Sequence, residues 1–119
     1  MSMTLRTREV NGTMIIDLSG RLTMGEPCAA VREEVLDEIG HGSRKILLNL
    51  ADVSYIDSSG LGQLIGSNAT VVNAGGRMKL LNLQNRVQDL LQVTKLLTVF
   101  DTYTSETAAL RSFAAAATQ

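Results

Sequence analysis

The chain has 119 residues, the length of one domain with its own core, and its formal net charge is -1. Its 11 basic residues are scattered and balanced by 12 acidic ones, so nucleic-acid binding is not indicated. No apolar run approaches the ~18 residues of a membrane helix, and the polar N-terminus carries no secretory signal. A single cysteine excludes an internal disulfide framework, so we expect a cytoplasmic protein with no membrane association.

The first forty residues predict a β-hairpin followed by a helix. Strand-like segments at 4–10 and 13–19 flank an Asn-Gly pair, the residues that a two-residue hairpin turn favours. Gly20 is expected to end the second strand. Pro27 suits the first turn of a helix, which periodic apolar residues extend to about residue 39.

The rest of the chain continues as alternating strands and helices. The expected elements are a strand at 45–50, a helix from the following junction to about residue 74, a strand at 77–82, a short helix at 87–91, an edge strand at 97–100 and a final helix at 104–116. The first of these strands is aliphatic enough to be buried on both faces. The pattern predicts an α/β fold, a mixed four- to five-stranded sheet that starts with a β-hairpin and has about four helices packed against it.

The junction between the buried strand and its helix carries an unusual group of residues. Asp57, Ser58 and Ser59 precede Gly60 at the expected helix N-terminus, at the carboxyl end of a central strand. In open α/β sheets, ligands and functional groups gather at such strand ends. Capping a helix N-terminus is worth about 1 kcal/mol and requires one side chain, so two serines and an aspartate exceed the need.

The helix after the junction is rich in glycine. Gly60, Gly62 and Gly66 lie in its first turns, where each costs about 0.8–1.0 kcal/mol relative to alanine. Gly62 and Gly66 share one bare face. This face either admits another element of the same domain or forms a flat docking surface for a partner protein.

Ser58 lies at the tip of the bare face and would be a natural switch. Phosphorylation adds a charge of about −1.5 to −2, which a helix N-terminus tolerates. A partner packed against the serine would meet bulk and charge, and juxtaposed like charges cost several kcal/mol. The modified protein would therefore stay folded and lose its partner.

The sequence Tyr-Ile-Asp-Ser-Ser-Gly-Leu-Gly at residues 55–62 resembles the signature of the STAS family, in particular the bacterial anti-sigma factor antagonists. The resemblance extends over nearly the whole chain, so we expect a single STAS domain at 1–119. Its further motifs are residues 18–22, residues 48–53, the Gly-Gly pair at 75–76 and residues 80–83.

The resemblance implies a regulator of transcription in stress responses. In the family, an unphosphorylated antagonist binds an anti-sigma factor and frees the sigma factor. The anti-sigma factor is often a serine kinase that inactivates its antagonist, and a protein phosphatase reverses the modification. We therefore expect a monomer or weak dimer whose partners are an anti-sigma factor of the kinase type and a phosphatase.

Residue by residue, the resemblance makes Ser58 the phosphoacceptor, with Asp57 orienting it and Ser59 capping the helix. The residues expected to contact the partner are Asp57, Ser59, Gly60, Leu61, Gly62, Gly66, Thr23 and Met24. Thr23 departs from the family, because many relatives carry an acidic residue there, near the phosphoacceptor. This difference affects the electrostatics of kinase docking and leaves the serine unchanged.

Other chemistry is weakly indicated. His41, the single histidine, lies in an expected surface turn far from Ser58, which is not in a Gly-x-Ser-x-Gly elbow. Cys28 is expected to be a small half-buried apolar residue. No metal-ligand spacing or phosphate-binding loop is present, so we expect no cofactor, no metal and no enzymatic activity. The alternatives keep the fold: a STAS scaffold subunit of a stress-sensing complex, or an accessory subunit of a transport system.

Overall fold

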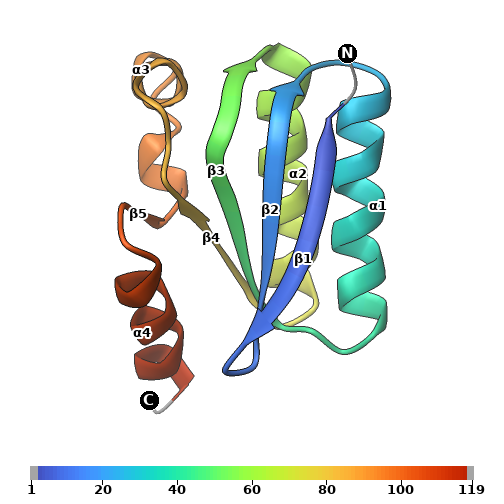
Figure 1. Cartoon of the computed structure of the whole chain (residues 1–119), viewed down its shortest axis with the longest axis vertical. Coiled ribbons are helices and arrows are strands. Elements are labelled where there is room, and N and C mark those ends of the chain that lie inside the picture. Colours follow the sequence, from blue (N-terminus) through green and yellow to red (C-terminus); the bar gives the residue numbers. More distant parts are fainter. Residues whose placement is uncertain (1–2, 118–119) are drawn as a thin grey trace.

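The computed structural model describes residues 3–117, which form a five-stranded mixed sheet and four α-helices (Figure 1). The elements in chain order are β1 Thr4–Val10, β2 Thr13–Leu22, α1 Glu26–Gly40, β3 Lys45–Ile56, α2 Ser58–Asn73, β4 Arg77–Leu81, α3 Asn85–Val93, the short 3₁₀ helix η1 Leu97–Val99, β5 Thr102–Tyr103 and α4 Glu106–Ala117. The expected α/β fold is confirmed.

The sheet has the strand order β1-β2-β3-β4-β5. β1 and β2 form the antiparallel hairpin, whose turn residues Asn11 and Gly12 both have positive φ, as a tight hairpin turn requires. The remaining neighbours are parallel. β3 lies at the centre, and its Ile46, Leu47 and Leu48 are fully buried, as the continuous aliphatic run predicts.

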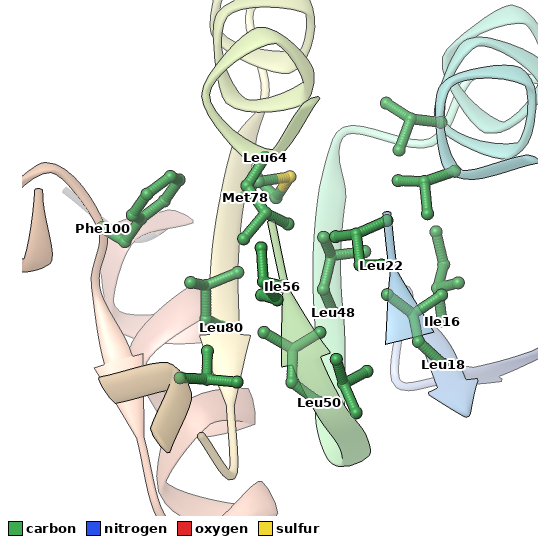
Figure 2. Close-up of a cluster of buried hydrophobic side chains, with 14 of the residues drawn as sticks. Ile16, Leu18, Leu22, Leu48, Leu50, Ile56, Leu64, Met78, Leu80 and Phe100 are labelled. Atoms are coloured by element: carbon green, nitrogen blue, oxygen red, sulfur yellow. The ribbon is translucent and has the colours of Figure 1, made fainter. Parts of the chain in front are cut away.

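The main core lies between the sheet and the helices α1 and α2 (Figure 2). Ile16 and Leu48 of the central strands pack there with Leu64 of α2, and all three are essentially inaccessible to solvent. Burying one such side chain contributes about 1.5–3 kcal/mol. The alternate strand residues Ile15 and Leu47 face the other side of the sheet and pack against α4.

Two predicted strand ends were wrong because β2 and β3 pair further than their local patterns indicate. β2 does not end at Gly20, which has φ of 124° and lies at a shift in register. Pairing resumes beyond it until Leu22 lies beside Ile56, so β3 continues past residue 50 to the junction. This pairing places the loop after β2 next to the N-terminus of α2.

The predicted edge strand at 97–100 was also wrong. That segment is the 3₁₀ helix η1, which turns Phe100 into the main core. The fifth strand follows it as two residues, Thr102 and Tyr103, paired with the end of β4. The preceding helix α3 lies beside the carboxyl end of β3, beyond the point where β4 stops (Figure 1).

Candidate functional site

Asp57 is the residue that caps helix α2. Its backbone is extended, and its Oδ1 accepts a hydrogen bond of 2.8 Å from the N–H of Gly60. The prediction that Ser59 provides the cap was wrong, because Ser58 and Ser59 already lie within the helix. Hydrogen bonds from the backbone N–H groups of Gly60 and Met24 hold the pKa of Asp57 below its ordinary value, so the cap stays ionised.

Asp57 also holds the loop between β2 and α1. Its Oδ2 accepts a hydrogen bond of 3.0 Å from the N–H of Met24, and its own N–H donates to the carbonyl of Leu22 at 3.3 Å. One carboxylate thus joins the start of α2 to the neighbouring loop. Thr23 and Met24 are therefore positioned beside Ser58, although they are more than thirty residues away in sequence.

The three glycines of α2 differ in whether packing within the domain requires a residue without a side chain. A Cβ at Gly60 would overlap the carbonyl oxygen of Leu22 and would lie 2.9 Å from the Cγ of that residue. Gly60 therefore permits a close approach within the domain. Gly62 and Gly66 have open space at the same position, with nothing within 4 Å of an added Cβ. Packing inside the domain does not explain these two.

Gly62 and Gly66 belong to an exposed face of α2 that carries no charge. We define the α2 face as the exposed residues Ser58, Gly62, Ile65, Gly66, Ala69, Val72 and Asn73. Ile65 and Val72 are 36% and 48% exposed. Solvent-facing helix surfaces are normally charged or polar, so an uncharged face with exposed aliphatic side chains suits contact with another molecule.

The other predicted site residues differ in their exposure to solvent. Ser58 itself is exposed. Met24 is 75% exposed, whereas Thr23 and Ser59 are half-buried. Leu61 is only 8% exposed, so it packs mainly in the core and offers little area to a partner. The structure thus brings the loop of Thr23 and Met24 and the start of α2 into one continuous region.

Sequence reasoning missed a groove that α3 forms beside Ser58. The groove has a volume of about 620 Å³, and Ser58 from α2 and Arg86 from α3 both line it. Apolar side chains form much of its surface, including the exposed Val93 and the ring of Tyr55, on which the guanidinium of Arg21 stacks at 4.8 Å. The amphipathic pattern of α3 indicated a helix, but no local signal placed it against the end of β3.

A cluster of carboxylates lies on α1, away from the residues predicted for the site. Oxygens of Glu34, Asp37 and Glu38 lie within 4.8 Å of one another, a group that the predicted absence of metal-ligand spacing did not anticipate. Burial, and then the neighbouring Glu38, raise the pKa of Glu34 to about 7. The raised pKa favours a protonated Glu34, which lowers the repulsion within the cluster. Only Asp37 of the three is exposed, whereas Glu34 is half-buried and Glu38 is buried.

The single cysteine and histidine are not arranged for catalysis. Burial raises the pKa of the Cys28 thiol, which disfavours the reactive thiolate. His41 is exposed, and its Nδ1 lies 2.8 Å from the carbonyl oxygen of Asp37 in the turn after α1. Within residues 3–117, no helix has the length and apolar character needed to cross a membrane.

The sequence matches the family described as STAS domain over residues 4–109. The chain belongs to the STAS domain family. This assignment confirms the resemblance carried by the Asp-Ser-Ser-Gly junction, which lies inside the matched region.

Two similar relatives of this chain are named as antagonists of anti-sigma factors. The anti-sigma-B factor antagonist of Bacillus subtilis is 29% identical over 101 residues, which cover 85% of this chain and 91% of that protein. The anti-sigma F factor antagonist of Paenibacillus polymyxa is 28% identical over 111 residues, covering 92% and 94%. Among solved structures, a candidate anti-sigma factor antagonist from Thermotoga maritima superposes with a TM-score of 0.84 at 25% identity, covering 92% and 93%.

Proposed function

We propose that this STAS domain is an anti-sigma factor antagonist. Its unphosphorylated form binds an anti-sigma factor and thereby releases a sigma factor for transcription. The observation that carries the proposal is Ser58, which is exposed at the head of the uncharged α2 face, beside a loop fixed by Asp57. The names of the full-length relatives support the same class of function.

The α2 face and Met24 form the proposed docking surface. Gly62 and Gly66 allow the backbone of a partner to approach α2 closely, and Ile65 and Val72 offer apolar area. Because the face has no charge, binding depends on shape and apolar contact. A new charge at its head would then change the affinity strongly, since no opposite charge on the face would offset it.

Phosphorylation of Ser58 is the proposed off-switch. The Ser58 Oγ attacks the γ-phosphorus of ATP, an Oγ–P bond forms, the bond to the ADP oxygen breaks, and the kinase removes the hydroxyl proton. A phosphatase restores the serine by using water and releasing inorganic phosphate. The anti-sigma factor acts as the kinase, and this chain supplies the substrate hydroxyl. We assign it no enzymatic activity and place it in the cytoplasm.

The domain should remain folded after modification. The cap of α2 is the Asp57 carboxylate, so the phosphate does not replace a structural hydrogen bond of Ser58. The added charge lies at a helix N-terminus, where negative charge is favoured by about 0.3–1 kcal/mol. Folding and partner binding are thus controlled by different side chains of one turn.

The test compares Ser58→Ala and Ser58→Asp in binding to the purified anti-sigma factor, identified by mass spectrometry after capture from the native cell. We expect Ser58→Asp to weaken binding at least tenfold, about 1.4 kcal/mol. Ser105→Asp is the control, because Ser105 is also an exposed serine at the N-terminus of a helix but lies on α4, where its Oγ accepts a hydrogen bond of 3.2 Å from the N–H of Ala108 that an aspartate can replace. Equal affinity of Ser58→Asp and the wild type would refute the switch.

Sedimentation velocity addresses the two alternatives. An antagonist should sediment as a monomer or weak dimer, whereas a scaffold subunit should assemble into large particles. An accessory subunit of a transport system should instead co-purify with a membrane protein. Phosphopeptide mapping from stressed and unstressed cells would show whether Ser58 carries the phosphate, and mapping to Ser59 would overturn the assignment.

A further inference from the structure

The groove beside Ser58 is lined both by the proposed phosphoacceptor and by a guanidinium. Its walls come from the first turn of α2 and from α3, and both Ser58 and Arg86 are exposed and line it. The groove is open and has a volume of about 620 Å³, which is ample for a phosphate group. The groove therefore offers space for a phosphate between them.

Arg86 has no other partner among the described residues. Within residues 3–117, no hydrogen bond or ion pair engages its guanidinium. The other charged groups of the groove are Asp57 and Asp89. Arg21 lies nearby, but its guanidinium already stacks on Tyr55 at 4.8 Å. Arg86 is thus the cation of the groove that is available to a new anion.

The backbone donors at the start of α2 are less available. The N–H of Gly60 donates to one oxygen of Asp57, and the N–H of Met24 donates to the other. A phosphate on Ser58 would compete with this carboxylate for those groups, and the like charge of Asp57 would repel it. Both effects disfavour a phosphate held by the capped turn itself, so the partner in the groove that remains for it is Arg86.

We propose that Arg86 is the intramolecular receptor for the phosphate of phosphorylated Ser58. The inference rests on the proposed function in taking Ser58 as the phosphoacceptor. A guanidinium and a phosphate form two parallel hydrogen bonds, and this geometry makes the pair stronger than a contact between point charges. The ion pair spans the groove and holds the phosphate in one place at the head of the α2 face.

An ion pair between Arg86 and the phosphate differs from simple charge repulsion of the partner, because it acts on the phosphate within the domain itself. If repulsion alone excluded the partner, the identity of residue 86 would not affect the phosphate. With the ion pair, the dianion is stabilised before any partner arrives, and the phosphorylated form gains a structural partner within its own domain. The second pKa of the phosphate, ordinarily about 6, then falls, because the ion pair favours the doubly charged form.

The experiment uses the full chain with phosphoserine incorporated at position 58 during synthesis, so that no kinase is needed. The second pKa of the phosphate is measured by ³¹P NMR titration in the wild type, Arg86→Ala and Arg86→Lys. We expect the wild-type value to lie at least ~0.5 pH unit below that of Arg86→Ala, about a threefold change in the proton-binding constant. Arg86→Lys should fall between them, because lysine keeps the charge without the bidentate geometry.

Two arginine variants serve as controls. Arg77→Ala removes an exposed arginine at the start of β4, at the opposite end of the parallel strands from Ser58, and should leave the titration unchanged. Arg21→Ala tests the guanidinium stacked on Tyr55. Equal pKa values in the wild type and Arg86→Ala, or a shift lost only in Arg21→Ala, would overturn the inference. Because the phosphate is installed chemically, this result is independent of whether cells phosphorylate Ser58, which phosphopeptide mapping decides separately.

Discussion

Gly60→Ala should destabilise the domain although alanine is the better helix former. The added methyl would overlap the carbonyl oxygen of Leu22 and would also crowd the Cγ2 atom of Ile56 at 3.0 Å. Overpacking costs about 1–3 kcal/mol, and we expect the upper end because the obstacle is backbone and cannot rotate away. Replacing a helical glycine returns about 1 kcal/mol. The net expectation is a loss of about 2 kcal/mol in the free energy of unfolding.

Gly62→Ala is the matched comparison in the same helix. Nothing lies within 4 Å of an added Cβ at this position, so the substitution should keep its full propensity gain of about 0.5–1 kcal/mol. The two glycines are two residues apart, yet their substitutions should change stability in opposite directions. The difference comes from the close approach of the ends of β2 and β3 to the first turn of α2.

Urea unfolding followed by circular dichroism measures both changes. The midpoint should fall for Gly60→Ala and rise for Gly62→Ala, with slopes that match the wild type, since the exposed area on unfolding is the same. If Gly60→Ala were as stable as Gly62→Ala, the close contact with Leu22 would not constrain this helix. The separation of structural from surface glycines would then be wrong.

Two further predictions concern the cap and the carboxylate cluster. Ser59→Ala should change the free energy of unfolding by less than about 0.5 kcal/mol, because Asp57 provides the cap. Asp57→Ala should lower the urea midpoint and make the loop at Met24 more sensitive to proteolysis. A larger loss of stability in Ser59→Ala than in Asp57→Ala would show that Ser59 is the cap. Glu34 has a pKa of about 7 in the fold, above its ordinary 4.5, so the folded state binds the extra proton and wild-type stability should fall as pH rises from 4.5 to 7. Glu34→Gln should flatten that fall in urea midpoints measured at pH 5 and pH 8, and an unchanged slope would contradict the assignment.

Local patterns predicted the order of the elements and the region of the site. The hairpin turn, the helix after Pro27 and the aliphatic strand at 45–50 are all indicated by residues close in sequence, and the structure has each of them. Alternation of strand and helix then restricts the topology, because parallel strands require crossover connections. The junction of carboxylate, serines and glycine was identifiable for the same reason.

The errors arose where distant segments determine local geometry. The predicted strand at 97–100 is a 3₁₀ turn because Phe100 is drawn into the core, which no short window reveals. The end of β2 depends on a shifted register with β3, and that register places Leu22 over the start of α2. Local propensity does not contain such pairings, so tertiary contacts overrode it.

By itself, the sequence determined that a serine pair, an aspartate and small residues would meet at the N-terminus of a helix after a central strand. Only the tertiary structure decided which of these residues caps the helix, which one packs in the domain and which one is exposed. The contact with Leu22 and Met24 makes Asp57 the cap and Gly60 a packing residue, which leaves Ser58 exposed above an uncharged face. The groove with Arg86 likewise exists only because α3 packs beside the end of β3. These arrangements depend on contacts between segments distant in sequence, whereas the motif depends on neighbours along the chain.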